Sequence, residues 1–365
     1  MATVKQIAKL AKVSIGTVSN VLNGLPSVRE PARKSVLAAI DQLNYQPSLL
    51  GRALRKDKTN MIVMIVPDIT NPFFPGVVRG AEDTAFQSGY RLVLCNSDND
   101  FAKEAAYMLE MRTYRPSGLI IVPADLSKGA EEAKAYTKAG SAVVYMDRIP
   151  TGWRGDAVTS AHEEGAYQAT NYLIELGHKR IATITGPLKG TSAAERLSGF
   201  MRAMKEARLP VPAGYIEETT FTKDGGQARA NVLLRQRSRP TAIFAANDLI
   251  AFGALTAIHD AGLACPDDIS VLGFDSLDIG DATAPTLSSV EQFASRLGAS
   301  AAQIILDRVG GDKSPARRIC IPTSLRVKGS TGSPRIEGRT HNAALRLPVQ
   351  HKLVSKDATT RKIKA

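Results

Sequence analysis

Apolar residues recur at two different spacings along the chain, and the spacing changes near residue 60. Over residues 4–11, 18–22 and 36–43, apolar positions return every three or four residues, which is the spacing of one buried helix face. Only a short break at Lys12 and Val13 separates the first two stretches. The pattern therefore predicts three short helices, of which the first two are joined by a tight turn.

Beyond residue 60, short apolar runs of strand length alternate with longer amphipathic stretches. The candidate strands are 61–67, 91–96, 118–123, 142–147, 181–186, 242–247 and 269–275, and the candidate helices are 76–87, 102–115, 163–176, 192–207 and 249–261. This alternation predicts parallel sheets that are covered by helices on both faces. Because the strands are too many for one comfortable sheet, we expect two α/β lobes that share several crossovers and enclose a cleft.

The predicted helices near the N-terminus carry capping signals. Thr3 and Gln6 have the spacing of a capping box, and Ser14 can cap the second helix. The outward face of that second helix carries Ile15, Gly16, Thr17, Ser19 and Asn20. Such a helix can enter the major groove of DNA and reach base edges with the side chains near its N-terminus. An ordinary three-helix bundle without a DNA role is the alternative.

The segment after the third predicted helix is apolar and basic at the same time. Its leucines and cationic residues are Leu49, Leu50, Leu54, Arg52, Arg55, Lys56 and Lys58. The leucines have no core of their own, and a helix this short is not stable alone. We expect the segment to order on DNA and to insert a leucine into the minor groove.

The formal net charge of +12 is concentrated at the two ends of the chain. Residues 1–60 carry a net charge of +7, residues 61–332 carry −1 and residues 333–365 carry +6. A near-neutral body with two basic ends is typical of a protein that uses its ends on a polyanion. For the tail, a role in solubility alone is an equally open alternative.

Two runs of residues, 4–23 and 43–55, resemble the headpiece and the hinge helix of the lactose/galactose-repressor family of bacterial transcription regulators. The first run reads VKQIAKLAKVSIGTVSNVLN, and the second contains LNYQP and RAL. The resemblance continues to about residue 328. It implies a small all-α helix-turn-helix headpiece at 1–46, a hinge helix at 47–59, and a two-lobed α/β domain with parallel sheets, like that of periplasmic binding proteins, at 60–328. The basic tail at 329–365 matches no feature of the family, and we expect it to be disordered.

The resemblance also implies a sequence-specific DNA-binding transcriptional regulator, expected to be a repressor, that acts as a homodimer on a palindromic operator. The expected DNA-binding residues are Thr3, Ser14, Ile15, Gly16, Thr17, Ser19, Asn20, Asn23, Arg52, Ala53 and Leu54. Among them, Leu54 is the expected wedge. Ile15 and Gly16 stand where many members of the family have larger polar residues, so we expect an operator that differs from the well-known ones.

Polar residues at the ends of the predicted strands indicate a ligand site in the cleft, because ligands of open α/β sheets bind beyond the carboxyl ends of the strands. Arg196 is a fork of donors, Asp275 is a pair of acceptors, Asn247 offers both, and Phe73 and Phe221 offer flat apolar faces. This set suits a sugar or another flat molecule with many polar groups. The alternative is an ion pair between the lobes with two core phenylalanines.

The resemblance favours the ligand site over this alternative. It implies an effector-binding role for Phe73, Arg196, Asn247 and Asp275, and it adds Asp147 and Gln292. Trp153, the sole tryptophan, is a further candidate for contact with the ligand. We therefore expect a small-molecule effector, a sugar or a sugar derivative, to control operator affinity from the cleft.

The chain carries no pattern of an enzyme, a metal site or a membrane span. Walker A, GxGxxG, HExxH, CxxC and GxSxG motifs are absent, so we expect no catalysis and no cofactor. No apolar run reaches the ~18 residues of a membrane span, and the N-terminus passes directly into a helical pattern without an export segment. Three widely spaced cysteines, Cys95, Cys265 and Cys320, fit a reduced cytoplasmic chain. We expect a cytoplasmic protein without a membrane partner.

Two functions from other classes are the alternatives. A sugar-binding transport receptor would have the same two-lobed body, but the predicted helix-turn-helix argues against it. An α/β enzyme with an incidental basic end is the second, and the lack of a nucleophile with its base argues against that one.

Overall fold

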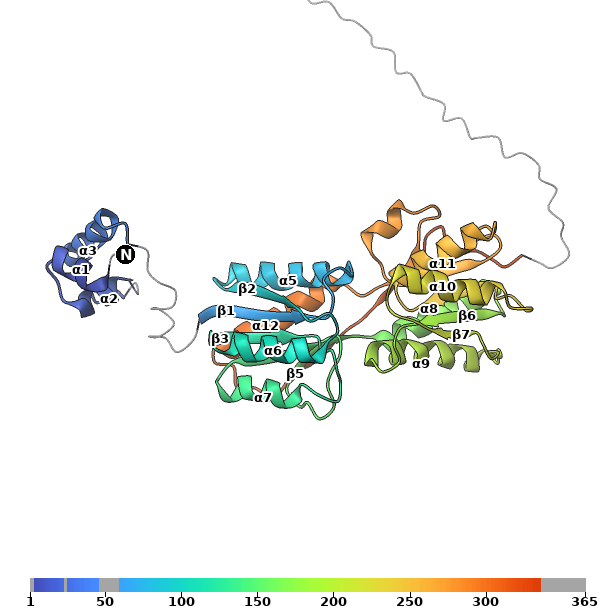
Figure 1. Ribbon diagram of the computed structural model, residues 1–365, viewed down its shortest axis with the longest axis horizontal. Helices are drawn as coiled ribbons and strands as arrows, with labels where there is room; N and C mark the ends of the chain where they lie inside the picture. The colour runs from blue at the N-terminus through green and yellow to red at the C-terminus, as the bar shows by residue number, and fades with distance from the viewer. Residues whose placement is uncertain (1–2, 23–24, 46–58, 336–365) are drawn as a thin grey trace, which may run out of the picture. The chain divides into compact units, whose positions relative to one another are not determined.

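The computed structural model describes residues 3–22, 25–45 and 59–335 (Figure 1). The residues described before position 46 form a small helical headpiece, and those from 59 onward form two α/β lobes. The predicted fold class, a helix-turn-helix followed by a two-lobed domain with parallel sheets, is confirmed. In the described part of the chain, no helix has the length and apolar character that crossing a bilayer requires.

The headpiece contains α1 (Val4–Leu10), α2 (Ile15–Leu22) and α3 (Glu30–Gln42). One residue from each helix, Ile7, Val18 and Val36, is fully buried in a shared apolar core. The predicted capping box is present, because Gln6 N–H donates to Thr3 Oγ1 at 3.3 Å and Thr3 N–H donates to Gln6 Oε1 at 2.8 Å. Lys12 has a φ of 52°, so the tight turn between α1 and α2 takes the left-handed conformation that glycine favours.

Lobe 1 is a six-stranded parallel sheet with the order β11-β5-β4-β3-β1-β2. Its strands are β1 (Thr59–Val66), β2 (Arg91–Asn96), β3 (Pro116–Ile121), β4 (Ala142–Met146), β5 (Asp156–Ser160) and β11 (Arg318–Ile321). Its helices are α5 (Phe73–Gln87), α6 (Phe101–Arg112), α7 (Ala130–Lys138) and α12 (Ala294–Val309). The central strands are buried on both faces, which explains why they read as continuous apolar runs.

The helices α5 and α12 of lobe 1 pack unusually close together. Gly80 and Gly298 make this possible, because a Cβ on Gly298 would lie 1.8 Å from the carbonyl oxygen of Val77. No side chain larger than hydrogen fits at this contact.

Lobe 2 is a six-stranded sheet with the order β12-β10-β9-β8-β6-β7, parallel except for β12. Its strands are β6 (Ile181–Thr185), β7 (Ile216–Glu218), β8 (Ala242–Ala245), β9 (Ser270–Asp275), β10 (Ser288–Glu291) and β12 (Ser324–Arg326). Its helices are α8 (His162–Glu175), α9 (Thr191–Glu206), α10 (Lys223–Leu234) and α11 (Asp248–Asp260), and a 3-10 turn covers Asp278–Ala282.

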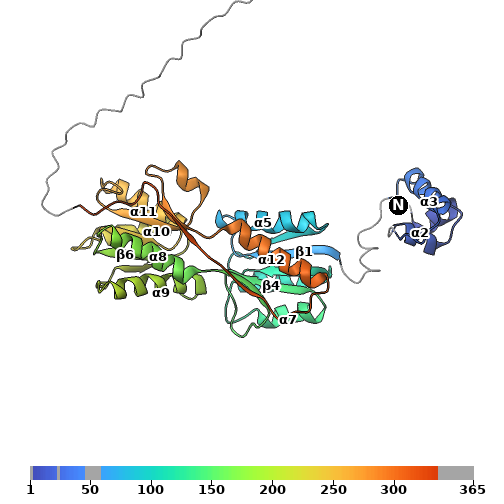
Figure 2. The same ribbon diagram turned by 180° about the vertical axis from the view of Figure 1, so that it is seen from behind.

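The described chain crosses between the lobes at three places, and Figure 2 shows connecting segments running between them. The crossovers follow β5 at Ala161, β10 at residues 292–293, and β11 at residues 322–323. The first and third are joined, because Ala161 N–H donates to the carbonyl of Ile321 at 2.9 Å. Phe293, in the second crossover, has a left-handed φ of 54°.

Residues beyond 328, the expected end of the two-lobed domain, still form hydrogen bonds with lobe 2. Ser330 is fully buried, and its carbonyl accepts the Val271 N–H of β9 at 2.8 Å. The carbonyl of Gly332 lies 2.8 Å from Nε2 of His178. The segment after 328 looked like a tail because it has few apolar residues, but its main chain is bonded to lobe 2. At the other end, β1 begins at Thr59, one residue before the expected start of the domain.

Candidate functional site

The face of α2 that was predicted to read DNA is exposed at Ile15 and Gly16 and partly exposed at its other residues. Val18 and Val21 point into the headpiece core, while Ile15 keeps 49% of its surface exposed. Ser14 caps the helix as predicted, because its Oγ accepts the Thr17 N–H at 3.0 Å. Ser14 and Gly16 are exposed, and Thr17, Ser19 and Asn20 are partly buried at the edge of the same helix.

Thr3 has a capping role in the structure, in addition to its predicted contact with DNA. Four further predicted DNA-binding residues, Asn23, Arg52, Ala53 and Leu54, lie outside the described residues. Their role in DNA binding therefore stays a prediction.

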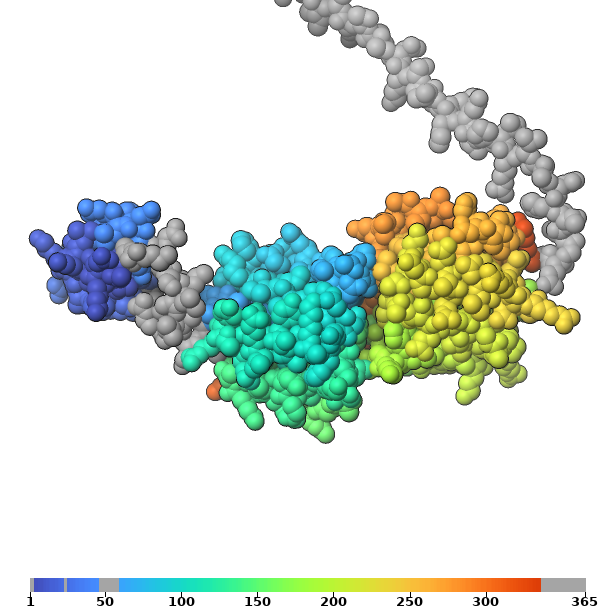
Figure 3. Space-filling view, in the orientation of Figure 1, coloured from blue at the N-terminus to red at the C-terminus, as the bar shows by residue number. Residues whose placement is uncertain are grey.

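Arg196 is the centre of a buried polar cluster where the lobes meet, and in Figure 3 the atoms of the two lobes touch along this boundary. The side chain comes from α9 and is only 4% exposed. Its Nη1 donates to the carbonyl of Ala246 at 2.5 Å and lies 4.0 Å from Oδ1 of Asp275. Its guanidinium lies 4.0 Å from the ring centre of Phe274 and 6.0 Å from that of Phe221. Arg196 therefore has an acceptor, a carboxylate and two aromatic rings around it.

Asp275 ends β9 with a strained φ of 121° and is buried. Its Oδ1 accepts a hydrogen bond from Nε2 of Gln292 at 2.5 Å. Burial raises the pKa of Asp275 well above its usual value, with Arg196 acting in the opposite direction. Asp275 and Arg196 both belong to lobe 2, so the alternative of an ion pair between the lobes does not describe them.

Asp147 brings lobe 1 into the cluster. It follows β4 with a φ of 63°, and its carboxylate lies 3.4 Å from Nε of Arg148 and 3.2 Å from Nε2 of His162. Burial alone would raise the pKa of Asp147, but its contact with His162 and the nearby arginines hold that pKa below its usual range. Asp147 is therefore an ionised acceptor at the lobe boundary.

His162 is a residue of this cluster that the sequence did not reveal. It is fully buried at the start of α8, and its Nδ1 lies 3.3 Å from Nη2 of Arg196. It thus stands between Asp147 of lobe 1 and Arg196 of lobe 2. Its position just beyond the carboxyl end of β5 would have marked it, but β5 was not among the predicted strands.

Several buried polar atoms of the cluster have no hydrogen-bond partner among the described residues. They include Nδ2 of Asn247, Nε of Arg196 and Oε1 of Gln292. Asn247 caps α11 with its Oδ1, which accepts the Ile250 N–H at 2.9 Å, so its amide nitrogen is left for another partner. An unpaired buried donor or acceptor costs about 1–3 kcal/mol. A ligand with hydroxyl groups can satisfy both the donors and the acceptor.

The two predicted aromatic faces differ in their surroundings. Phe221 lies beside Arg196 and against Gly186, where an added Cβ would be 2.2 Å from its ring. Phe73 is 5% exposed and packs edge-on against Phe74 in the apolar core of lobe 1. The contacts of Phe73 are therefore those of a core residue, which was the alternative to a ligand contact. A contact between Phe73 and a ligand stays a prediction.

Trp153, the further candidate for the cleft, lies in a different place. It lines a cavity of about 300 Å³ in lobe 1 together with Ala142 and Asp156, the first residues of β4 and β5. The cleft residues follow the opposite ends of these strands. Among the described residues, no group of three or more histidine, cysteine, aspartate or glutamate side chains could hold a metal ion.

Comparison with known proteins matches both parts of the chain to described families. Residues 3–48 match the family "Bacterial regulatory proteins, lacI family", and residues 170–331 match a "Periplasmic binding protein-like domain". The chain is 37% identical over 319 residues to the HTH-type transcriptional repressor PurR of Photobacterium profundum, which covers 87% of this chain and 95% of that protein. It is 36% identical over 319 residues to PurR of Vibrio vulnificus, at 87% coverage of this chain and 95% of that protein.

Solved structures are similar over nearly the whole chain. The lac repressor dimer bound to operator and the anti-inducer ONPF has a TM-score of 0.81 at 26% identity and covers 91% of this chain and 99% of its own. The complex of the transcriptional regulator CelR with cellobiose has a TM-score of 0.69 at 29% identity and covers 90% of this chain and all of its own.

Proposed function

The chain belongs to the lacI family of bacterial regulatory proteins and is a DNA-binding transcriptional repressor controlled by a small-molecule effector, and from this premise we propose a function for each of its parts. The headpiece reads operator DNA with α2, and the polar cluster between the lobes binds the effector. The relatives are transcriptional regulators and not enzymes.

We propose that the effector is a sugar or a sugar derivative that binds around Arg196. The observation that carries this proposal is the set of buried, unpartnered polar atoms on Arg196, Asn247 and Gln292, beside the aromatic ring of Phe221. Hydroxyl groups both donate and accept, so a ring with several of them can satisfy this mixed set. Solved relatives bound to cellobiose and to ribose support the same ligand class.

Calorimetry with a panel of neutral mono- and disaccharides tests the effector site. The substitution Arg196→Ala should abolish measurable binding of the sugar that the wild type binds. Operator binding in the absence of effector should be unchanged. Arg202→Ala is the matched control, because Arg202 lies on the same helix and pairs with Glu163 and Glu164 at the surface. Sugar binding by Arg196→Ala with wild-type affinity would overturn the assignment.

For DNA binding, we propose that Ser14, Ile15, Gly16, Thr17, Ser19 and Asn20 face the major groove and that Leu54 opens a base step in the minor groove. The exposure of Ile15 and the capped start of α2 support the first part. Leu54→Ala should reduce operator bending and affinity while the fold of the two lobes is unchanged. Gel-shift phasing assays measure the bend, and a bend equal to that of the wild type would exclude the wedge.

We further propose that the repressor is a homodimer that binds a palindromic operator in the cytoplasm. Exposed apolar residues on the edge strand β2 and on the helices before and after it support the dimer, because Phe86, Leu94 and Leu109 keep 57%, 39% and 64% of their surface exposed. Sedimentation of Leu109→Glu, with Leu188→Glu in lobe 2 as the control, tests this surface. Wild-type dimerisation of Leu109→Glu would exclude this contact.

A further inference from the structure

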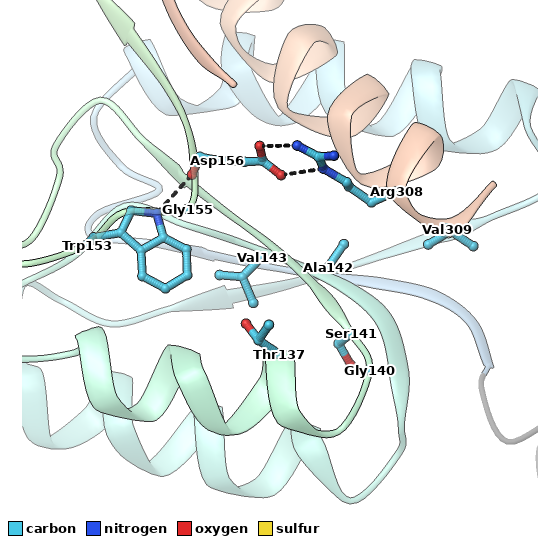
Figure 4. Close-up of a pocket in the computed structure, with 10 residues that line it drawn as sticks. All are labelled: Thr137, Gly140, Ser141, Ala142, Val143, Trp153, Gly155, Asp156, Arg308 and Val309. Carbon is cyan, nitrogen blue, oxygen red and sulfur yellow. Dashed lines mark hydrogen bonds and ion pairs between the residues drawn. The ribbon is translucent and has the colours of Figure 1, made fainter. Parts of the chain in front are cut away.

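The cavity beside Trp153 is separate from the effector cluster. It opens at the amino-terminal ends of β4 and β5, where Ala142 and Asp156 begin the strands, whereas Asp147 follows the carboxyl end of β4 (Figure 4). Strands rise ~3.3 Å per residue, so the two places are about 17 Å apart along β4. A molecule in this cavity would not contact Arg196 or Asp275.

The indole of Trp153 forms one wall of the cavity, and its own polar group is already satisfied. Nε1 donates to the carbonyl of Asp156 at 3.0 Å, and the ring of Tyr145 packs edge-on at 5.0 Å. Gly155 lets the ring lie flat on the main chain, because a Cβ there would be 2.3 Å from the indole. The ring is therefore held on one side, and its remaining exposed surface is available for stacking.

The charged residues of the cavity neutralise each other. Nε and Nη2 of Arg308 each donate to one carboxylate oxygen of Asp156 at 2.8 Å, and Figure 4 shows this fork beside the indole. A further charged group on a ligand would find no unpaired counter-charge in these two residues. The other walls are small or apolar side chains, such as Ala142, Val143 and Val309.

Two hydroxyl groups give the cavity its remaining polarity. Ser141 Oγ donates to the carbonyl of Pro116 at 2.6 Å, and Thr137 Oγ1 donates to the carbonyl of Ala133 at 3.3 Å. Because each hydroxyl donates its proton to a main-chain carbonyl, each oxygen keeps lone pairs that can accept a hydrogen bond. A ligand that donates one N–H or O–H would meet an acceptor here.

From these contacts, we propose that the Trp153 cavity is a second small-molecule site, which takes a neutral, planar aromatic compound that carries one hydrogen-bond donor. The cavity of about 300 Å³ is at the small end of ligand sites and suits one ring or two fused rings. A peptide or an oligosaccharide is too large for it.

Titration of the full-length protein with benzimidazole tests the proposal. The titration is followed by NMR. The chain has one tryptophan, so its NMR spectrum has one indole N–H signal, which comes from Trp153 in the wall of the cavity. The expected result is a saturable shift of this signal together with a calorimetric binding isotherm. No saturable shift would overturn the proposal.

Substitutions locate the binding. Thr137→Phe fills the mouth of the cavity from an exposed helix position and should weaken benzimidazole binding by about tenfold or more. Lys138→Phe, the neighbouring exposed position outside the cavity, is the matched control and should bind as the wild type does. Wild-type affinity of Thr137→Phe would overturn the site.

Further variants distinguish binding in this cavity from binding in the effector cleft and from a general loss of fold. Arg196→Ala should bind benzimidazole as the wild type does, and loss of binding in this variant would mean that the probe occupies the cleft. Trp153→Phe should keep calorimetric binding while Trp153→Ala loses it, since only the aromatic face is needed. Equal affinity of the two tryptophan variants would contradict stacking.

Discussion

Glu104 is a buried carboxyl group whose ionisation should oppose folding at neutral pH. It lies in the first turn of α6 with no exposed surface, and its Oε2 accepts the Ala124 N–H at 2.6 Å. Its Oε1 has no hydrogen-bond partner in the part of the chain that the structure describes. Burial raises the pKa of Glu104 from 4.5 to about 7, and the bond from Ala124 and the charge of Arg148 offset this only in part.

The sign of the effect follows from proton binding. Because the folded state holds the proton to higher pH than the unfolded state, the contribution of Glu104 is fully present below pH 4.5 and is lost as the pH rises to about 7. At about 1.4 kcal/mol per pH unit, the loss amounts to about 3 kcal/mol. Glu104→Gln removes the ionisable group but keeps an oxygen for the Ala124 N–H.

Urea unfolding of both proteins at several pH values between 5 and 8, followed by circular dichroism, measures this difference. Glu104→Gln should gain stability relative to the wild type as the pH rises, by up to about 3 kcal/mol at pH 8. Glu110→Gln removes a carboxyl group from an exposed position of the same helix and is the control. A difference between Glu104→Gln and wild type that stays constant from pH 5 to 8 would refute the reasoning.

Three other substitutions have expected outcomes. Gly298→Ala places a Cβ 1.8 Å from the Val77 carbonyl oxygen and must push α5 and α12 apart, so calorimetry should show a clearly lower Tm, and an unchanged Tm would contradict the close contact. His162→Ala removes the group between the two lobes and should weaken effector binding by about tenfold in calorimetry, while retained affinity would exclude its role. Arg308→Leu removes the ionic partner of the buried Asp156 carboxylate, which keeps its bond from the Arg317 N–H, and should cost about 2 kcal/mol in urea unfolding at pH 7. Since Arg308 offsets the effect of burial and keeps the pKa of Asp156 low, that loss should shrink below about pH 4, and a pH-independent loss would contradict the pairing.

The sequence predicts most of the fold because the spacing of apolar residues within a long helix or strand is enough to identify that element. The second predicted strand, 91–96, coincides with β2, and the capping box at Thr3 is present in the structure. Five strands of the described chain were not predicted, β5, β7, β10, β11 and β12, and all of them are short. Two of them are also polar: β7 is Ile-Glu-Glu and β10 is Ser-Ser-Val-Glu. Such strands form because neighbouring strands offer main-chain partners, and a residue pattern does not contain that information.

The candidate site is predicted less completely than the fold for the same reason. Arg196 and Asp275 could be selected because their residue types suit polar recognition, and Asp275 also ends a clear strand. His162 could not be selected, since β5 was not predicted and a single histidine has no pattern. The burial of Phe73 depends on packing within lobe 1, which its residue type alone leaves open.

Two residues of the polar cluster are also part of the connections between the lobes, and this bears on how effector binding changes the protein. His162 opens α8 directly after the first crossover, and Gln292 precedes Phe293, the left-handed residue of the second. Both side chains reach the Arg196–Asp275 pair, Gln292 by its bond to Asp275 and His162 by its approach to Arg196. A ligand shifts a conformational equilibrium only as far as its contacts differ between the two states. Groups at the crossovers change their relative position whenever the lobes move. The contacts of a ligand with these groups therefore differ between the two arrangements of the lobes, and no change in the packing of either core is needed.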